Sequence, residues 1–186
     1  MRPGDAGTFG GTMGLLAGTE SFITGLLYSV RPPAHVVSLI GLGLLAGRAI
    51  WSTQARTLAA FAFGLVSSLG AIAWGAGETP ASDVLLAMAL LCGLIAATGI
   101  TVSAWFTAPA ALVSGTALGL DSPPDAILLR EAVLMLIGTA CGDIALLAMM
   151  SAAASALSRL WRGIVIRVAG SWIAAIALLV LALRWT

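Results

Sequence analysis

The stretch DVLLAMALLCGLIAATGITVSAWFTAPAALVSGTALGL, residues 83–120, decides how many times this chain can cross a membrane. It is one apolar run of about 38 residues, and a single helix of that length would be about 57 Å long. A bilayer core is roughly 30 Å thick, so the run is too long for one crossing and just long enough for two. A turn and an interfacial aromatic are available near its middle: Thr98, Gly99, Thr101, Ser103, Trp105 and Pro109. We therefore predict a fourth and a fifth membrane helix here, the fifth being short or partly re-entrant.

The composition of the whole chain points to a membrane protein. Of the 186 residues, 60% are hydrophobic and only 9% are charged, and the mean hydropathy is +1.05. Soluble domains carry about 25% charged residues. The sequence therefore predicts an all-α integral membrane helix bundle in contact with lipid. The net charge of +1 gives no sign of a nucleic-acid partner.

The remaining apolar runs predict five more helices, which makes about seven transmembrane helices in all. Their expected ranges are 12–30, 33–51, 56–76, 126–156 and 164–184. Residues 1–11 are expected to form a loose tail and residues 12–186 a single transmembrane domain, because no Pro/Ser-rich linker divides them. Glu20 lies inside the first apolar run, which argues against a cleaved signal peptide.

The positions of the charged residues predict the orientation in the membrane. With seven spans, one side receives most of the arginines: Arg2, Arg48, Arg56, Arg159 and Arg162. The other side receives most of the acids, with three arginines: Glu78, Asp83, Asp121, Asp125, Glu131, Arg31, Arg130 and Arg184. Cytoplasmic loops carry an excess of Lys and Arg, so we expect the N-terminus inside and the C-terminus outside. The arginines beside the last helix are expected to contact anionic lipid.

Two acids fall near the middle of expected membrane helices. Glu20 is in the first helix with Thr24 four residues later, and Asp143 is in the sixth with Thr139 four residues earlier. Each hydroxyl therefore shares a helix face with its acid. A carboxyl group at the bilayer centre is costly unless it faces the bundle or has a function. The functional interpretation is a cation or proton site between the first and sixth helices; the structural one is an interhelical hydrogen bond.

His35, the one histidine of the chain, follows Pro32 and Pro33 between two apolar runs. It is a candidate metal ligand, but the sequence favours an interfacial histidine that caps a loop, because the same segment offers no second ligand and Arg31 would repel a cation. The acids of the later loop, residues 119–125, are expected to face outward, where they could gather cations or begin the sixth helix. Cys92 and Cys141 match no zinc or haem spacing and are expected to be buried as small apolar residues.

Small residues at four-residue spacing predict close helix packing, for example Gly43 with Gly47 and Gly115 with Gly119. A Gly-Thr pair recurs inside three apolar runs, which is either the remnant of an internal repeat or chance in a chain with 22 glycines. No nucleophile with a neighbouring base, phosphate-binding loop or dinucleotide fingerprint is present, so no enzyme is predicted.

The chain resembles the HupE/UreJ family of small polytopic membrane proteins associated with hydrogenases and ureases. Three stretches carry the resemblance: residues 25–47, GTALGLDSPP at residues 115–124, and RVAGSWIAAIALLVLALR at residues 167–184. The resemblance implies a multi-pass protein of the bacterial cytoplasmic (inner) membrane that brings Ni²⁺ or Co²⁺ across for metalloenzyme assembly. It implies no tightly bound cofactor.

The early signature of that family, H-P-x-x-G-x-D-H, falls on residues 28–35. Only His35 matches it, because Tyr28, Ser29, Pro32 and Ala34 stand where the other four signature residues would be. The resemblance therefore places this chain in a branch that lacks the full motif.

Two functions follow from these observations. The first is a metal-ion permease or metallocentre accessory protein, with Glu20, His35 and Asp143 as metal ligands and Thr24 and Thr139 along the transport path. The second is a non-transporting structural subunit that packs against other membrane subunits or a second copy of itself, its acids being structural. The glycine-rich helices and the incomplete motif favour the second function.

Overall fold

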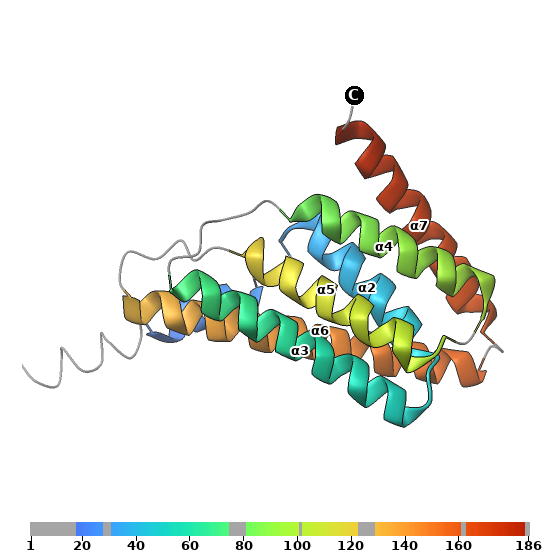
Figure 1. Cartoon of the computed structure of the whole chain (residues 1–186), viewed down its shortest axis with the longest axis horizontal. Helices are drawn as coiled ribbons and strands as arrows, with labels where there is room; N and C mark the ends of the chain where they lie inside the picture. Colours follow the sequence, from blue (N-terminus) through green and yellow to red (C-terminus); the bar gives the residue numbers. More distant parts are fainter. Residues whose placement is uncertain are drawn as a thin grey trace, which may run out of the picture.

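We describe the chain from a computed structural model, over residues 18–27, 31–74, 81–100, 102–122, 129–160 and 163–184. Within these ranges the chain forms seven helical segments and no strand, which confirms the predicted all-α class. The expected tail at residues 1–11 lies outside the described residues. After a helix at residues 18–27, the helices are α2 (Pro33–Gly47), α3 (Trp51–Ala73), α4 (Ser82–Thr98), α5 (Ala104–Leu120), α6 (Leu129–Leu160) and α7 (Ile164–Arg184) (Figure 1).

Three of these helices are long and apolar enough to cross a membrane, namely α3, α6 and α7. The helices α2, α4 and α5 are also apolar but shorter, with 15, 17 and 17 residues. A crossing needs about 20 apolar residues, so each of these three helices is shorter than a full crossing requires. The three long helices indicate a membrane protein.

The apolar run at residues 83–120 does divide into two helices, as its length predicts. The first ends at Thr98, and Gly99 then adopts a left-handed conformation with φ of 78°. Glycine takes this conformation without the steric cost that a Cβ would bring, which is why it commonly ends helices. The next helix starts at Ala104 after an extended Ser103.

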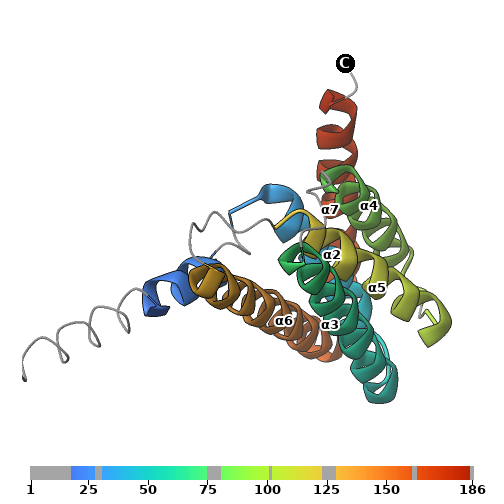
Figure 2. The same ribbon diagram turned by 60° about the vertical axis from the view of Figure 1, so that its left-hand side comes forward.

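The central helix of the bundle is α2, which contacts each of α3 to α7 and has ten of its 15 residues buried. Around it, α3 packs most extensively on α5, and α4 on α7 (Figures 1 and 2). These pairs approach so closely that glycines are required, as predicted. A Cβ at Gly64 would lie 2.5 Å from the Leu112 carbonyl oxygen, and one at Gly93 would lie 2.9 Å from that of Gly170.

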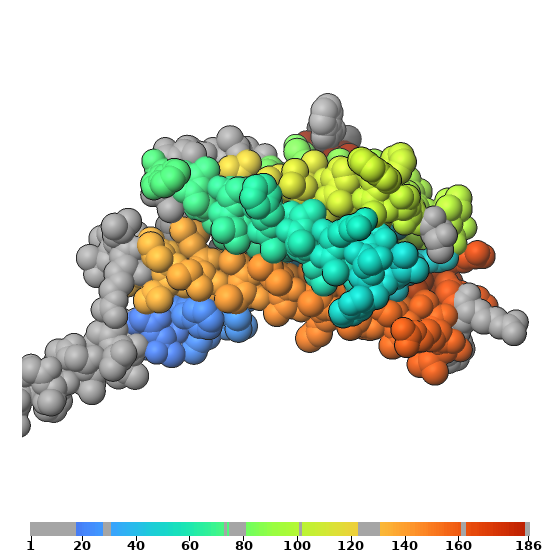
Figure 3. Space-filling model, turned by 60° about the horizontal axis from the view of Figure 1, so that its bottom comes forward, coloured from blue at the N-terminus to red at the C-terminus, as the bar shows by residue number. Residues whose placement is uncertain are grey.

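The helix at residues 18–27 and α2 both run along α6 in the direction of α6. Gly18 and Gly25 approach α6 at residues 134–139, whereas Gly43 and Gly47 approach it at residues 150–155. Figure 3 shows residues 18–27 against the N-terminal part of α6. The two segments therefore follow one another along a single long helix, and seven alternating spans are not confirmed.

The six labelled helices alternate in direction (Figure 1), and most of the described charged residues lie near the two ends of the bundle. We call one end of the bundle the arginine end, where α2 and α6 finish and α3 and α7 start. It carries Arg48, Arg56, Arg159 and Arg167. We call the opposite end the acidic end, where Asp83, Asp121 and Glu131 lie together with three arginines, Arg31, Arg130 and Arg184. Among the described residues, the arginine end therefore carries no acid, whereas the acidic end carries acids and arginines in equal number.

Candidate polar path between α2 and α5

His35 is fully buried in the first turn of α2, rather than at the surface beside a loop. The turn is set by the two prolines. Pro32 is extended, as a residue before proline prefers, and Pro33 starts the helix, where its missing N–H costs nothing. The Pro32 carbonyl then accepts a hydrogen bond from the His35 backbone N–H at 3.1 Å. The Arg-Pro-Pro sequence therefore fixes His35 at the point where α2 enters the bundle.

The partner of His35 is Asp121, the residue that ends α5. The imidazole Nε2 lies 3.1 Å from the Asp121 Oδ2, and the Asp121 side chain is 20% exposed. This contradicts the expectation that Asp121 simply faces outward. The carboxylate lies near the N-terminus of α2, where the helix dipole favours its negative charge, but it also ends α5, where the dipole opposes that charge. Donation from Nε2 would leave the Nδ1 lone pair as the basic site of the ring.

Two buried serines lie further into the bundle on the same two helices. Ser38 lies one turn after His35 on α2, and Ser114 lies two turns before Asp121 on α5. Residues at these spacings share a helix face. Neither serine hydroxyl has a hydrogen-bond partner among the described residues, although each is only 1% exposed. We call His35, Asp121, Ser38 and Ser114 the polar path; an orphaned buried hydroxyl is rare and calls for an explanation.

Asp143 and Thr139 are buried in α6, as predicted, with exposed fractions of 0% and 2%. The Thr139 hydroxyl donates to the Met135 carbonyl oxygen at 3.0 Å, four residues back along its own helix. That hydrogen is therefore used by the backbone, and only the hydroxyl oxygen of Thr139 remains to accept a bond. Asp143 thus stands as an ionisable side chain inside the bundle, which is costly and commonly functional.

Glu20 and Thr24 share a face of the helix at residues 18–27, as predicted, but both are exposed. The face that meets α6 is set by Gly25, since a Cβ there would overlap the Met135 carbonyl group. The interpretation that Glu20 faces the bundle was wrong for this reason. Over the described part of the chain, no group of three or more His, Cys, Asp or Glu side chains could hold a metal ion. The predicted trio of Glu20, His35 and Asp143 is therefore not assembled as one site.

Two further buried polar pairs join helices toward the arginine end. Gln54 donates to the Ser151 hydroxyl oxygen at 2.5 Å, and Thr57 donates to that of Thr107 at 3.1 Å. Sequence reasoning missed both pairs, although Gln54 and Thr57 stand three residues apart in an apolar helix, which is a signal for a shared polar face. The cysteines also differ from the prediction: Cys92 is buried, whereas Cys141 is exposed on α6.

Comparisons with known proteins give no relative of this chain. No protein-family model matches it, and neither a curated protein nor a solved structure does. The resemblance to the HupE/UreJ family therefore stays a prediction.

Proposed function

We propose that this protein is a multi-pass membrane permease for a divalent cation, Ni²⁺ or Co²⁺ as the family resemblance implies. The observation that carries the proposal is the polar path, in which His35 and Asp121 are followed by two buried hydroxyls without partners. Ionisable side chains buried between apolar helices are expensive and typically mark the pathway of a substrate ion. The incomplete signature would then be offset by Asp121, which supplies a carboxylate next to His35.

We further propose that residues 18–47 make a single interrupted crossing, so that the chain crosses the membrane six times. The support is that residues 18–27 and α2 follow one another along α6 in one direction. Interrupted helices are typical of transporters, where the break lies beside the substrate. The arginine end would face the cytoplasm, and the acidic end would face outward. A cation would approach Asp121 from the acidic end.

Each group of the path has a chemical role suited to a passing cation. Asp121 is partly exposed and attracts the ion, and the imidazole of His35 offers a nitrogen ligand that suits Ni²⁺ or Co²⁺. The oxygens of Ser38 and Ser114 would replace water ligands further in. Asp143 lies on a different helix, α6, and would hold the ion or a counter-transported proton deeper in the bundle.

The test is uptake of Ni²⁺ or Co²⁺ into proteoliposomes. Asp121→Asn and Asp143→Asn should each reduce uptake at least tenfold, because each removes a carboxyl group that the ion would meet, Asp121 in the polar path and Asp143 deeper in the bundle. Asp83→Asn is the matched control, since Asp83 lies at the same end but is about half exposed and pairs with Arg184. Uptake by the unmodified protein no faster than by empty liposomes would rule the proposal out.

A second candidate is a structural subunit of a larger membrane complex. The exposed face of residues 18–27 favours it, because Glu20 and Thr24 are both exposed there. A partner helix that packs on this face would contact both side chains. Purification in a mild detergent should then recover the chain with a partner, and Glu20→Leu should release that partner. A chain that always elutes alone argues against this function.

A further inference from the structure

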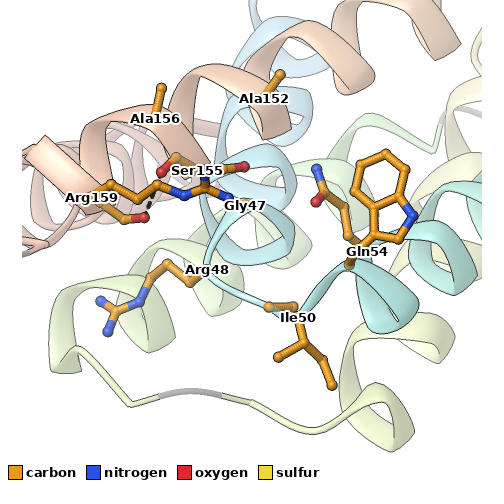
Figure 4. Close-up of a pocket in the computed structure, with 11 residues that line it drawn as sticks. Gly47, Arg48, Ile50, Gln54, Ala152, Ser155, Ala156 and Arg159 are labelled. Atoms are coloured by element: carbon orange, nitrogen blue, oxygen red, sulfur yellow. Dashed lines mark hydrogen bonds between the residues drawn. The ribbon is translucent and has the colours of Figure 1, made fainter.

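The arginine end contains a cavity that the polar path does not use. It has a volume of about 490 Å³ and lies between the α2–α3 connection and the last turns of α6 (Figure 4). Arg48, Trp51 and Gln54 line one side, and Ser155 and Arg159 line the other. A cavity of this size falls within the range of small-ligand sites, roughly 300–1,000 Å³.

The charge of this cavity is positive. Arg48 and Arg159 both line it, and no acidic residue is among its lining residues. The acidic side chains that the structure describes lie elsewhere: Asp83, Asp121 and Glu131 at the acidic end, Asp143 inside the bundle and Glu20 on the helix at residues 18–27. Two guanidinium groups without a described carboxylate create a potential that attracts an anion.

One terminal nitrogen of the Arg48 guanidinium group makes a hydrogen bond, and the other makes none with the described residues. Its Nη2 donates to the Gly99 carbonyl oxygen, and its Nη1 is shielded from solvent without a partner among the described residues. Burial lowers the pKa of Arg48 below its usual value, and the nearby charge of Arg167 lowers it further. An anion bound in the adjoining cavity would stabilise the charged form of Arg48.

The direct ligand is Arg159. In Figure 4 its side chain lies alongside Ser155 with the guanidinium near Gly47, whereas the head of Arg48 points away. The hydroxyls of Ser155 and Ser158 already donate to the backbone carbonyls of Ser151 and Ser155, at 2.7 and 2.8 Å. Of the side chains that α6 contributes, Arg159 therefore has donors left for a ligand, whereas the two serine hydroxyls do not.

The N-terminus of α3 adds to this site. Ile50 and Trp51, which line the cavity, begin a helix that has no side-chain cap. Uncapped N–H groups and the helix dipole favour an oxyanion at such a position. Trp51 is 80% exposed, as expected of a tryptophan at the level of lipid headgroups.

We propose that this cavity binds a phosphate group, with Arg159 as its direct ligand and Arg48 supplying further positive charge. The fork of a guanidinium group matches two phosphate oxygens, and such charge-assisted hydrogen bonds are the stronger ones. The phosphate could belong to an anionic lipid or be free in solution, because both present the same oxygens to the site.

The experiment measures binding of two probes to the delipidated full-length protein in detergent. Phosphatidylglycerol binding is followed by native mass spectrometry against phosphatidylcholine, and inorganic phosphate binding by calorimetry. Arg159→Gln should weaken binding of the recognised probe about tenfold. Arg56→Gln is the matched control, because it removes one exposed arginine from the same end but outside the cavity. Arg159→Lys should retain part of the affinity.

The two sources give different outcomes. If the cavity recognises a lipid, phosphatidylglycerol binds in preference to phosphatidylcholine, and millimolar phosphate does not displace it. If the cavity recognises free phosphate, the inorganic ion binds, and millimolar phosphate displaces the lipid. The proposal is overturned if the unmodified protein binds neither probe, or if Arg56→Gln weakens binding as much as Arg159→Gln. Melting curves of each variant show that it is folded. Cation uptake is a separate property, so its loss or presence does not decide this proposal.

Discussion

At the scale of single residues, the carboxylate of Asp121 allows His35 to be buried. Removing it by Asp121→Ala leaves a buried imidazole nitrogen without that partner, which should lower the free energy of unfolding by about 1–3 kcal/mol. Asp83→Ala breaks an exposed pair with Arg184 and should cost at most about 1 kcal/mol. Denaturation of both variants in the same detergent compares the two losses. Equal losses would show that the His35–Asp121 pair contributes no more than a surface ion pair.

The sequence could identify some of these residues but not how they meet. The burial of Asp143 and Thr139 was predictable, because both lie in the middle of a long apolar run. The pairing of His35 with Asp121 was not, since 86 residues separate them and each alone resembles a residue at a helix end. The exposure of Glu20 was not predictable either. Its helix meets α6 through the close approach of Gly25, and residue spacing alone does not specify that contact.

At the scale of helices, glycines decide which faces can meet. Gly64 and Gly70 lie on the same helix, but a Cβ at Gly64 would be 2.5 Å from the Leu112 carbonyl oxygen and one at Gly70 would meet nothing within 4 Å. Gly64→Ala should therefore push α3 from α5 and lower the free energy of unfolding by about 1–3 kcal/mol. Gly70→Ala should have no cost, or gain up to about 1 kcal/mol from helix propensity. Unfolding in detergent measures both, and similar losses would contradict the packing described.

Two of the three Gly-Thr pairs make the same helix contact, which the sequence alone left open. Phe-x-x-Gly-Leu occurs at residues 22–26 and 61–65, and Gly-Thr-Ala-x-Gly at residues 115–119 and 138–142. A Cβ at Gly115 would lie 3.1 Å from Leu65 N, and one at Gly138 would lie 3.1 Å from Leu26 N. The same contact therefore joins α3 to α5 and residues 18–27 to α6. Since α5 and α6 run in opposite directions, the two pairs are inverted relative to each other (Figure 1), as in many transporter repeats.

At the scale of the whole molecule, apolar run lengths predicted the helix bounds better than they predicted the path of the chain. The division at Gly99 and the last helix at residues 164–184 agree with the prediction. The first apolar run was long enough to be counted as a separate span, but its described helix covers only residues 18–27 and runs in the same direction as α2. Hydropathy reports that a segment is apolar and says nothing about which way it runs.

Six and seven crossings place the start of the chain on opposite sides of the membrane. In a background of Cys92→Ala and Cys141→Ala, single cysteines can be introduced as Gly7→Cys, as Trp74→Cys at the acidic end and as Ile50→Cys at the arginine end. Trp74 and Ile50 are 95% and 73% exposed, so both should react with a membrane-impermeant maleimide from their own side. With residues 18–47 as one crossing, Gly7→Cys reacts from the same side as Trp74→Cys. Reaction from the side of Ile50→Cys would instead establish seven crossings, because the first apolar run would then have to cross the membrane by itself.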